Sequence, residues 1–180
     1  MQSYIELKVP ISFNEPWFEE LRDRLDGVNI RWQHGYYHIT MAFLNDSPSG
    51  VDLITGLTHR LHQATAPTIT FDKLDAFATS GGRRQVINLT ATDIPADFLS
   101  LVEDIHRHFK SKGCIIQSAF KLHVTLGRVD DPRMNVGKLL DVINEVELPS
   151  TTLTLRNVEF RILRGDTLAT WKLTDTTQGH

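Results

Sequence analysis

Segments with two different hydrophobic periods alternate along the chain. Residues 4–9 alternate between apolar side chains and tyrosine or charged side chains, as a half-buried strand does. Leu53, Leu57 and Leu61 recur at helical spacing within residues 51–64. From these patterns we expect helices over 15–26, 51–64, 95–112 and 136–146, and strands over 4–9, 30–33, 36–44, 68–78, 85–91, 115–116, 120–129, 153–163 and 168–173.

Residues that favour helix ends mark several of these boundaries. Asn14 is the expected N-cap of the first helix, Pro16 lies in its first turn, and Gly27 follows its last turn. Pro95 opens the third helix and Gly113 ends it. The connections that remain are too short to link two independent domains.

The order of elements predicts one α+β domain over residues 1–180. Element types, rather than sequence, repeat between the two halves of the chain. In each half a helix (15–26, then 95–112) leads to a short strand, a longer strand and another helix (51–64, then 136–146).

Composition narrows the class of protein. The 180 residues carry 19 basic and 22 acidic side chains, a net charge of −3, which argues against a domain that coats long nucleic acids. The lone Cys114 excludes an intramolecular disulfide and cannot form a thiolate metal site by itself. No signal-peptide pattern opens the chain, and no stretch reaches the ~18 consecutive apolar residues of a membrane span. We therefore expect a soluble, cytoplasmic monomer.

The tripeptide His-x-Thr occurs twice, first at His38 and Thr40 and again, 85 positions later, at His123 and Thr125. One such tripeptide is weak evidence because chance matches are common. Both occurrences, however, lie in strand-like apolar runs at the same place in the repeat. Side chains two positions apart on a strand project to one face, so each histidine shares a face with its threonine. Two such strands brought together place two imidazoles and two hydroxyls around one cleft.

This set of side chains suits in-line displacement at a phosphodiester. A neutral histidine takes a proton from the attacking hydroxyl or water, and an imidazolium gives a proton to the leaving oxygen. Thr40 and Thr125 then bind the non-bridging oxygens. The sequence leaves open which of His38 and His123 is the acid and which is the base. The alternative is that both motifs are structural, with threonine present for its strand propensity, but the symmetric pair favours the catalytic interpretation.

Strand parity nominates two further residues for the cleft face. Tyr36 and Lys121 each lie two residues before a motif histidine, so Tyr36 can stack on a nucleobase and Lys121 can attract phosphate. The alternatives are an exposed strand tyrosine and a solvated lysine. Arg128 has the opposite parity from His123 and is expected to be structural. Tyr4 on the first strand can line a cleft, but packing in the interior is its expected role.

The pair of motifs resembles the signature of the 2H phosphoesterase superfamily. Arg31 and Trp32 followed by residues 37–44 are similar to the first motif of its 2′-5′ RNA ligase and RNA 2′,3′-cyclic phosphodiesterase (LigT-like) branch, and residues 122–129 are similar to the second. Met41 stands where leucine is common, which is a tolerable apolar exchange. The resemblance implies a bilobal, pseudo-symmetric fold with an antiparallel sheet in each lobe, flanking helices and a central cleft.

The same resemblance implies an activity. It is the metal-independent hydrolysis of 2′,3′-cyclic phosphate ends of RNA or nucleotides to a phosphomonoester, with 2′-5′ RNA ligation as the reverse reaction. His38 and His123 would be catalytic and Thr40 and Thr125 would bind substrate, with no metal or other cofactor. The partner would be a nucleotide or RNA end that carries a cyclic or 2′-linked phosphodiester. Two alternatives stay open: a phosphodiesterase for 2′-5′ or cyclic oligonucleotides, and a nucleotide- or RNA-binding module without turnover.

Overall fold

The computed structural model describes residues 2–46, 51–79 and 81–175 of the chain. The helices are α1 (Pro16–Arg24), α2 (Val51–Gln63), α3 (Ala96–Ser111) and α4 (Val136–Ile143). The strands are β1 (Ser3–Lys8), β2 (Ile30–Trp32), β3 (His38–Leu44), β4 (Thr68–Phe71), β5 (Lys73–Ala78), β6 (Gln85–Thr90), β7 (Val124–Val129), β8 (Thr151–Thr154), β9 (Asn157–Ile162) and β10 (Thr167–Lys172). No helix among the described residues is long and apolar enough to cross a membrane.

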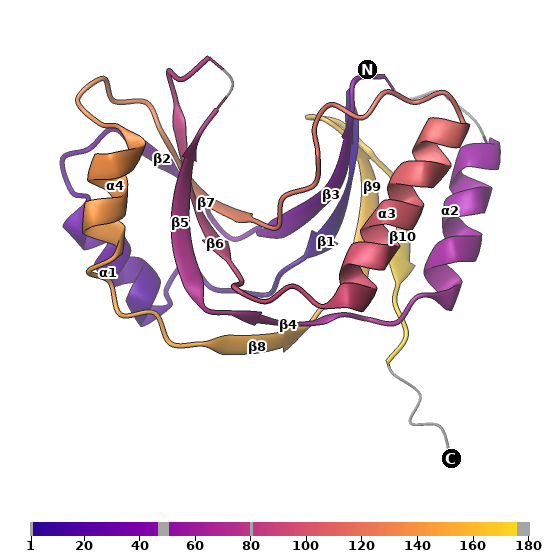
Figure 1. The fold of residues 1–180 in the computed structure, drawn as a ribbon, viewed down its shortest axis with the longest axis horizontal. Helices are drawn as coiled ribbons and strands as arrows, with labels where there is room; N and C mark the ends of the chain where they lie inside the picture. The colour runs from indigo at the N-terminus through magenta and orange to yellow at the C-terminus, as the bar shows by residue number, and fades with distance from the viewer. Residues whose placement is uncertain (1, 47–50, 80, 176–180) are drawn as a thin grey trace.

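Eight of these strands form one antiparallel sheet. Its order is β10-β9-β1-β3-β7-β6-β5, and β2 also pairs with β7. β3 and β7 share one registered pair, Ile39 with Val124, so the sheet divides there into two four-stranded parts. β4 and β8 form a separate two-stranded sheet below the other strands in Figure 1.

Helices flank each part of the sheet and give the molecule two lobes (Figure 1). The His38 lobe consists of β10, β9, β1 and β3 with α2 and α3, which contact each other and pack on β10 and β3. The His123 lobe consists of β2, β7, β6 and β5 with α1 and α4. Arg24 of α1 lies 2.8 Å from Glu145, just after α4. The expected α+β fold with antiparallel strands and flanking helices in two lobes is confirmed.

The chain crosses between the lobes ahead of each motif strand. α1 and β2 lie in the His123 lobe, and the following β3 and α2 lie in the His38 lobe. α3 lies in the His38 lobe, where Ile116 forms a bridge to Leu44 of β3, and the following β7 and α4 lie in the His123 lobe. The repeat of elements is therefore present, and the two crossings bring β3 and β7 together at the centre of the sheet.

Apolar residues on one face of each helix fill the interior of the lobes. In α3 the buried residues are Phe98, Val102, Ile105 and Phe109, which follow helical spacing, and His108 is buried beside them. Full burial of a phenylalanine contributes about 2 kcal/mol. This packing holds α3 against β3, the strand of the first motif.

Several boundaries differ from the sequence-based expectation, for steric reasons or because of strand pairing. The N-cap of α1 is Glu15 rather than Asn14. A residue before proline is sterically kept out of the helical region, so the helix can begin only at Pro16. The strands expected over 68–78 and 153–163 are each two strands, interrupted at Asp72 and at residues 155–156. In both cases the first part belongs to the β4–β8 sheet and the second part, β5 or β9, to the large sheet.

The two motif strands also begin later than expected. β3 begins at His38 rather than at residue 36. The amide of Val9 still donates to the carbonyl of Tyr37 over 2.9 Å, but the carbonyl of Val9 accepts from the amide of Ile11 and the pairing ends there. β7 begins at Val124 rather than at residue 120, because the carbonyl of Leu122 accepts a hydrogen bond from the Thr90 hydroxyl instead of from a strand amide. Tyr36 and Lys121 therefore lie outside regular strands.

Candidate active site

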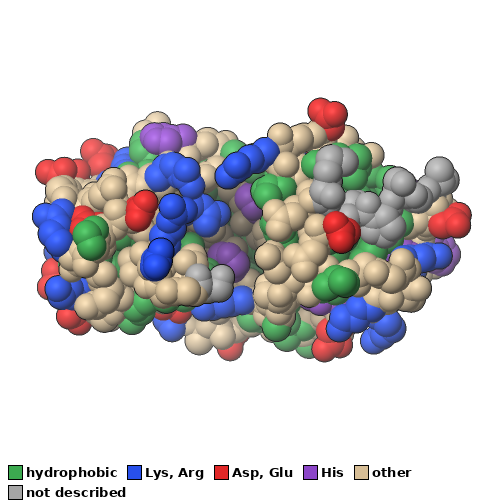
Figure 2. Space-filling model, turned by 90° about the horizontal axis from the view of Figure 1, so that it is seen from above, with side chains coloured by type: hydrophobic (Ala, Val, Ile, Leu, Met, Phe, Trp, Pro, Cys, Tyr) green, Lys and Arg blue, Asp and Glu red, His purple; other side chains and the backbone are tan. Residues whose placement is uncertain are grey.

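Both His-x-Thr motifs line one cavity of about 550 Å³ between the lobes. Seen from above, histidine side chains lie in a hollow near the middle of the molecule, and lysine and arginine side chains gather on its left, towards the His123 lobe (Figure 2). The lining residues outside the motifs come from both lobes and from the segment before β7: Tyr4, Gln33, Tyr36, Phe43, Phe77, Thr79, Val86, Gln117, Ser118, Arg128 and Leu163. The juxtaposition that the spacing of the motifs predicted is present.

A bulge follows each motif and changes which side chains face the cavity. In β3, Thr40 pairs with Glu6 and Ala42 pairs with Ile5, so Met41 has no partner residue on β1. In β7 the same irregularity leaves Leu126 without a partner residue on β6.

The bulges reverse the alternation of side chains beyond each threonine. Phe43 and Arg128, each three residues after a motif threonine, consequently line the cavity. The expectation that Arg128 is structural was wrong, because strand parity holds only where the pairing is regular. Tyr4 also lines the cavity, with its ring centroid 5.9 Å from that of His38.

The backbone carbonyl of Lys121 and the ring of Phe77 hold the His123 side chain. Its Nδ1 atom donates a hydrogen bond to the carbonyl of Lys121 over 2.9 Å. Its ring lies edge-on to Phe77 at 5.1 Å between centroids, and the Lys121 ammonium lies 4.1 Å from the centroid of that same phenyl ring. Lys121 is exposed beside the cavity rather than among its lining residues. Burial, followed by the nearby charges of Lys121 and Arg128, lowers the pKa of His123 despite that backbone hydrogen bond.

His38 has a different environment. Its side chain is 26% exposed, and its Nδ1 atom lies 3.4 Å from Oε2 of Glu6, which is completely buried. Burial, then the like charges of His123, Arg128 and Arg161, lower the pKa of His38 to about 4. Both motif histidines of the free protein are therefore neutral at neutral pH.

Tyr36 lines the cavity, but its hydroxyl belongs to a buried network. The hydroxyl donates to Oε1 of Glu6 and accepts a hydrogen bond from Arg161 Nη1 over 3.2 Å. The Lys8 ammonium lies 5.5 Å from the centroid of the Tyr36 ring. Through its hydrogen bond, Tyr36 also holds the Glu6 carboxyl group, whose other oxygen lies 3.4 Å from Nδ1 of His38.

Glu6 and Arg161 are the contributors that sequence reasoning missed. Glu6 sits on the polar side of the alternating strand β1, where the pattern predicts solvent exposure, yet none of its side chain is exposed. The only signal in the sequence is that Glu6 has the same parity as Tyr4 and Lys8. Because β1 lies between β3 and β9, neighbours from both strands cover Glu6.

A family profile of the 2′-5′ RNA ligase superfamily matches residues 10–167. The chain belongs to this superfamily. The family resemblance drawn from the two motifs is thereby confirmed, and the protein is a 2H phosphoesterase by family and by fold. A search of curated proteins found none that matches the chain in sequence.

Solved structures share the fold of this 2H phosphoesterase over nearly its whole length. Usb1 from Kluyveromyces marxianus superposes with a TM-score of 0.67 at 8% identity, covering 96% of this chain and 98% of that one. TT0787 of Thermus thermophilus gives 0.61 at 16% identity, with coverages of 98% and 100%. E. coli LigT, crystallised with 3′-AMP, gives 0.56 at 17% identity, with coverages of 97% and 98%. At these identities the likeness establishes the fold.

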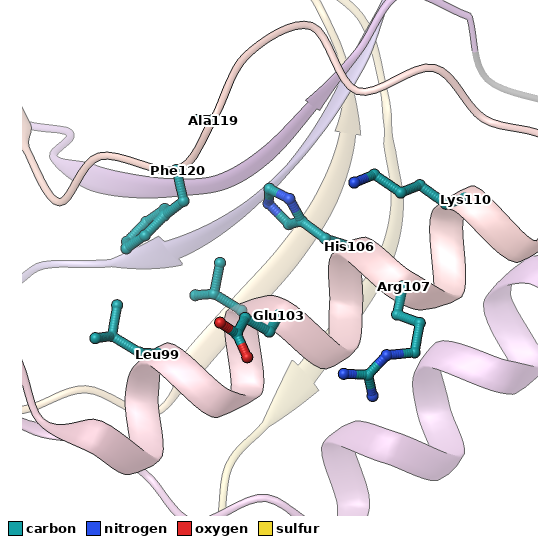
Figure 3. A pocket seen from close by; sticks show the side chains of 8 residues that line it. Leu99, Glu103, His106, Arg107, Lys110, Ala119 and Phe120 are labelled. Carbon is teal, nitrogen blue, oxygen red and sulfur yellow. The ribbon is translucent and has the colours of Figure 1, made fainter.

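A second cavity of this 2H phosphoesterase, of about 590 Å³, lies along α3 (Figure 3). Leu99, Lys110 and Phe120 are among its lining residues, and none of the motif side chains is. His106 on its wall forms a hydrogen bond of 2.7 Å with the carbonyl of Met41, the bulged residue after Thr40. One residue on the wall of this cavity, His106, therefore supports the bulge that follows the first motif.

The described residues contain no group of three or more His, Cys, Asp or Glu side chains arranged to hold a metal ion. The groups available for chemistry in the central cavity include the two imidazoles, the hydroxyls of Thr40 and Thr125, and the guanidinium of Arg128.

Proposed function

We propose that this protein is a metal-independent phosphodiesterase that hydrolyses 2′,3′-cyclic phosphate ends of RNA or nucleotides to a phosphomonoester. Ligation through a 2′-5′ linkage is the reverse of the same reaction. The observation that carries the proposal is the meeting of both His-x-Thr motifs and Arg128 in one cavity. General acid–base catalysis at phosphorus needs two proton carriers on opposite sides of an anion-binding pocket, and this cavity supplies both components.

The hydrogen bonds of the histidines support different roles for them. A carbonyl oxygen only accepts, so Nδ1 of His123 carries its proton and Nε2 of the neutral ring has a free lone pair. His123 is thus suited to be the general base. Nδ1 of His38 faces a carboxyl group instead, which leaves its Nε2 atom free to carry the proton of a general acid.

The proposed reaction balances with these two groups. His123 takes a proton from water while the water oxygen forms a bond to phosphorus. The bond from phosphorus to one ribose oxygen breaks, and His38 protonates that oxygen. Thr40, Thr125 and Arg128 bind the non-bridging oxygens as negative charge redistributes among them.

Two further observations support a nucleotide as the substrate. Phe77 and Tyr36 line the cavity and offer aromatic faces next to the imidazoles, which suits stacking of a nucleobase. Solved structures of the same fold include E. coli LigT complexed with 3′-AMP and Usb1 with uridine monophosphate.

The test is incubation of the protein and EDTA with each of the four nucleoside 2′,3′-cyclic monophosphates, with products identified by phosphorus NMR. We expect a 2′- or 3′-monophosphate from the wild type. His38→Ala and His123→Ala should each lower turnover by about 10²–10⁴-fold, the usual contribution of a general acid or base. His59→Ala is the matched control, because His59 is an exposed histidine of α2 outside the cavity.

Retained activity in both His38→Ala and His123→Ala contradicts the proposal. Turnover of 2′-5′ or cyclic oligonucleotides alone would indicate the oligonucleotide phosphodiesterase instead. Binding of RNA without turnover, weakening steeply with salt, would indicate the binding module.

A further inference from the structure

A buried carboxyl group lies directly beneath His38. Glu6, in the middle of β1, is completely buried and is paired across the sheet with Thr40 on one side and Glu159 on the other. The titratable and charged groups around it come from three elements and the segment before β3: Tyr4 and Lys8 of β1, Tyr36 and His38, and Glu159 and Arg161 of β9.

One oxygen of Glu6 is held firmly, and the other is left for His38. Oε1 accepts the hydrogen bond of the Tyr36 hydroxyl and lies 3.8 Å from Nη1 of Arg161. Oε2 of Glu6 and Nδ1 of His38 are both buried and have no hydrogen bond among the described residues, yet they lie 3.4 Å apart. Buried polar atoms without a partner are rare, and one proton between these two atoms would satisfy both.

We propose that Glu6 is the positioning residue of the catalytic acid, sharing a proton with Nδ1 of His38. This proposal rests on the proposed function, in which His38 protonates the leaving oxygen. When the proton is on Oε2, Glu6 donates a hydrogen bond to Nδ1 of His38. The single N–H proton of the neutral imidazole is then kept on Nε2. When Nε2 gives its proton to the leaving oxygen, the Oε2 proton moves to Nδ1. His38 stays neutral, Glu6 becomes a carboxylate, and the proton that His123 took from water later restores Glu6 through solvent.

The environment of Glu6 agrees with this role. Burial, opposed by Arg161 and aided by Glu159, raises the pKa of Glu6 to about 7, so between about pH 4 and 7 the carboxyl group holds a proton while His38 is neutral. His123 has no such neighbour, because the Lys121 carbonyl on its Nδ1 cannot titrate. This difference between the two Nδ1 partners gives the two histidines different proton chemistry.

The first test reads the ring tautomer by nitrogen NMR and does not depend on turnover. In the wild type, His38 should carry its proton on Nε2 at pH 6 and shift it to Nδ1 above pH 8, as Glu6 ionises. In Glu6→Gln the shift should be absent, since an amide donates a hydrogen bond but does not ionise. Glu159→Gln, a change to the same network 3.6 Å from Arg161, should keep the shift but move it to lower pH, because Glu159 helps to raise the pKa of Glu6.

The second test separates proton donation from folding. Glu6→Gln should lower kcat by about 10- to 100-fold on the cyclic phosphate with less than a threefold change in KM, and the basic limb of the pH profile should disappear. A cyclic substrate with sulfur in place of the leaving oxygen should restore most of that loss, because a thiolate leaves without being protonated.

The proposal is overturned by an Nδ1 proton on His38 at pH 6, or by equal losses in Glu6→Gln and Glu159→Gln that the sulfur substrate does not restore. If the wild type hydrolyses no cyclic phosphate, the proposed function fails, and the tautomer measurement still decides whether Glu6 and His38 share a proton.

Discussion

Two histidines with the same motif differ at the residue scale in what holds their Nδ1 atoms. A carbonyl that only accepts fixes the tautomer of His123, whereas a carboxyl that titrates faces His38. Burial and nearby cations lower the pKa of both rings. Both rings are consequently neutral in the free protein at neutral pH.

Binding of a phosphate anion should therefore be accompanied by proton uptake. A negative charge within a few ångströms favours the imidazolium, so a nucleoside 3′-monophosphate should raise the pKa of His38 or His123 by about 1–3 pH units. NMR titration of the ring protons with and without the nucleotide measures the change. Titration curves that coincide would show that the anion binds away from the motifs.

The pair of His38 and Glu6 also predicts how stability depends on pH. The folded pKa of His38 is about 4 against 6.5 for a free histidine, so protonation of the unfolded chain weakens the fold as pH falls from 6.5 to 4. Glu6 acts in the opposite sense. Its folded pKa of about 7 against 4.5 means that the folded state holds the extra proton, and stability is lost as pH rises from 4.5 to 7.

Because the two effects oppose each other, the free energy of unfolding should change less between pH 4.5 and 6.5 in the wild type than in Glu6→Gln. That variant leaves the effects of His38 and of His123, whose pKa is also lowered, and its free energy of unfolding should fall by at least about 2 kcal/mol from pH 6.5 to 4.5. Urea unfolding at the two pH values measures the difference. A flat profile in the variant would mean that His38 is not buried as neutral imidazole.

At the scale of elements, the bulges after the two motifs decide the composition of the site. Each bulged carbonyl is satisfied from outside the strand ladder: that of Met41 by the His106 ring at 2.7 Å and that of Leu126 by the amide of Gln33 at 2.8 Å. Helix packing and loop contacts thus support the irregularities that turn Arg128 towards the cavity.

The close contact of α2 with α3 gives a stability prediction at this scale. A Cβ atom added to Gly56 of α2 would lie 2.2 Å from Cε1 of His108, a buried ring that is bonded to the Leu53 carbonyl at 2.9 Å. Gly56→Ala should therefore lower the free energy of unfolding by about 1–3 kcal/mol through overpacking.

Gly137→Ala in α4 is the matched control for this substitution. Its nearest neighbour is Oδ1 of Asn135 at 3.4 Å, so the exchange should leave stability unchanged or raise it by up to about 1 kcal/mol. Thermal or urea unfolding of both variants compares them. If Gly56→Ala lowers the free energy of unfolding no more than Gly137→Ala does, α2 and α3 adjust to the added methyl group without cost.

At the scale of the whole molecule, the site exists because the chain crosses from one lobe to the other ahead of each motif strand. β3 and β7 come from distant parts of the sequence and meet through one registered pair, which places the two motifs on either side of one cavity. Side chains from both lobes are required, so neither half of the chain could form the cavity alone.

Most elements and the four motif residues followed from the sequence by itself. Helical and strand periods are local properties of the chain, and so is the rule that residues two apart on a strand share a face. Those rules found the strands and helices, the repeat, and the shared orientation of each histidine with its threonine.

Tertiary structure alone decided what surrounds those four residues. The bulges arise from pairing between strands, so parity along β7 could not place Arg128 correctly. Glu6 reads as an exposed strand residue until β1 is inserted between β3 and β9, whose side chains then bury it under His38. The sequence thus determines which groups can do the chemistry, while contacts between distant segments determine their proton affinities, because burial and neighbouring charges exist only in the folded chain.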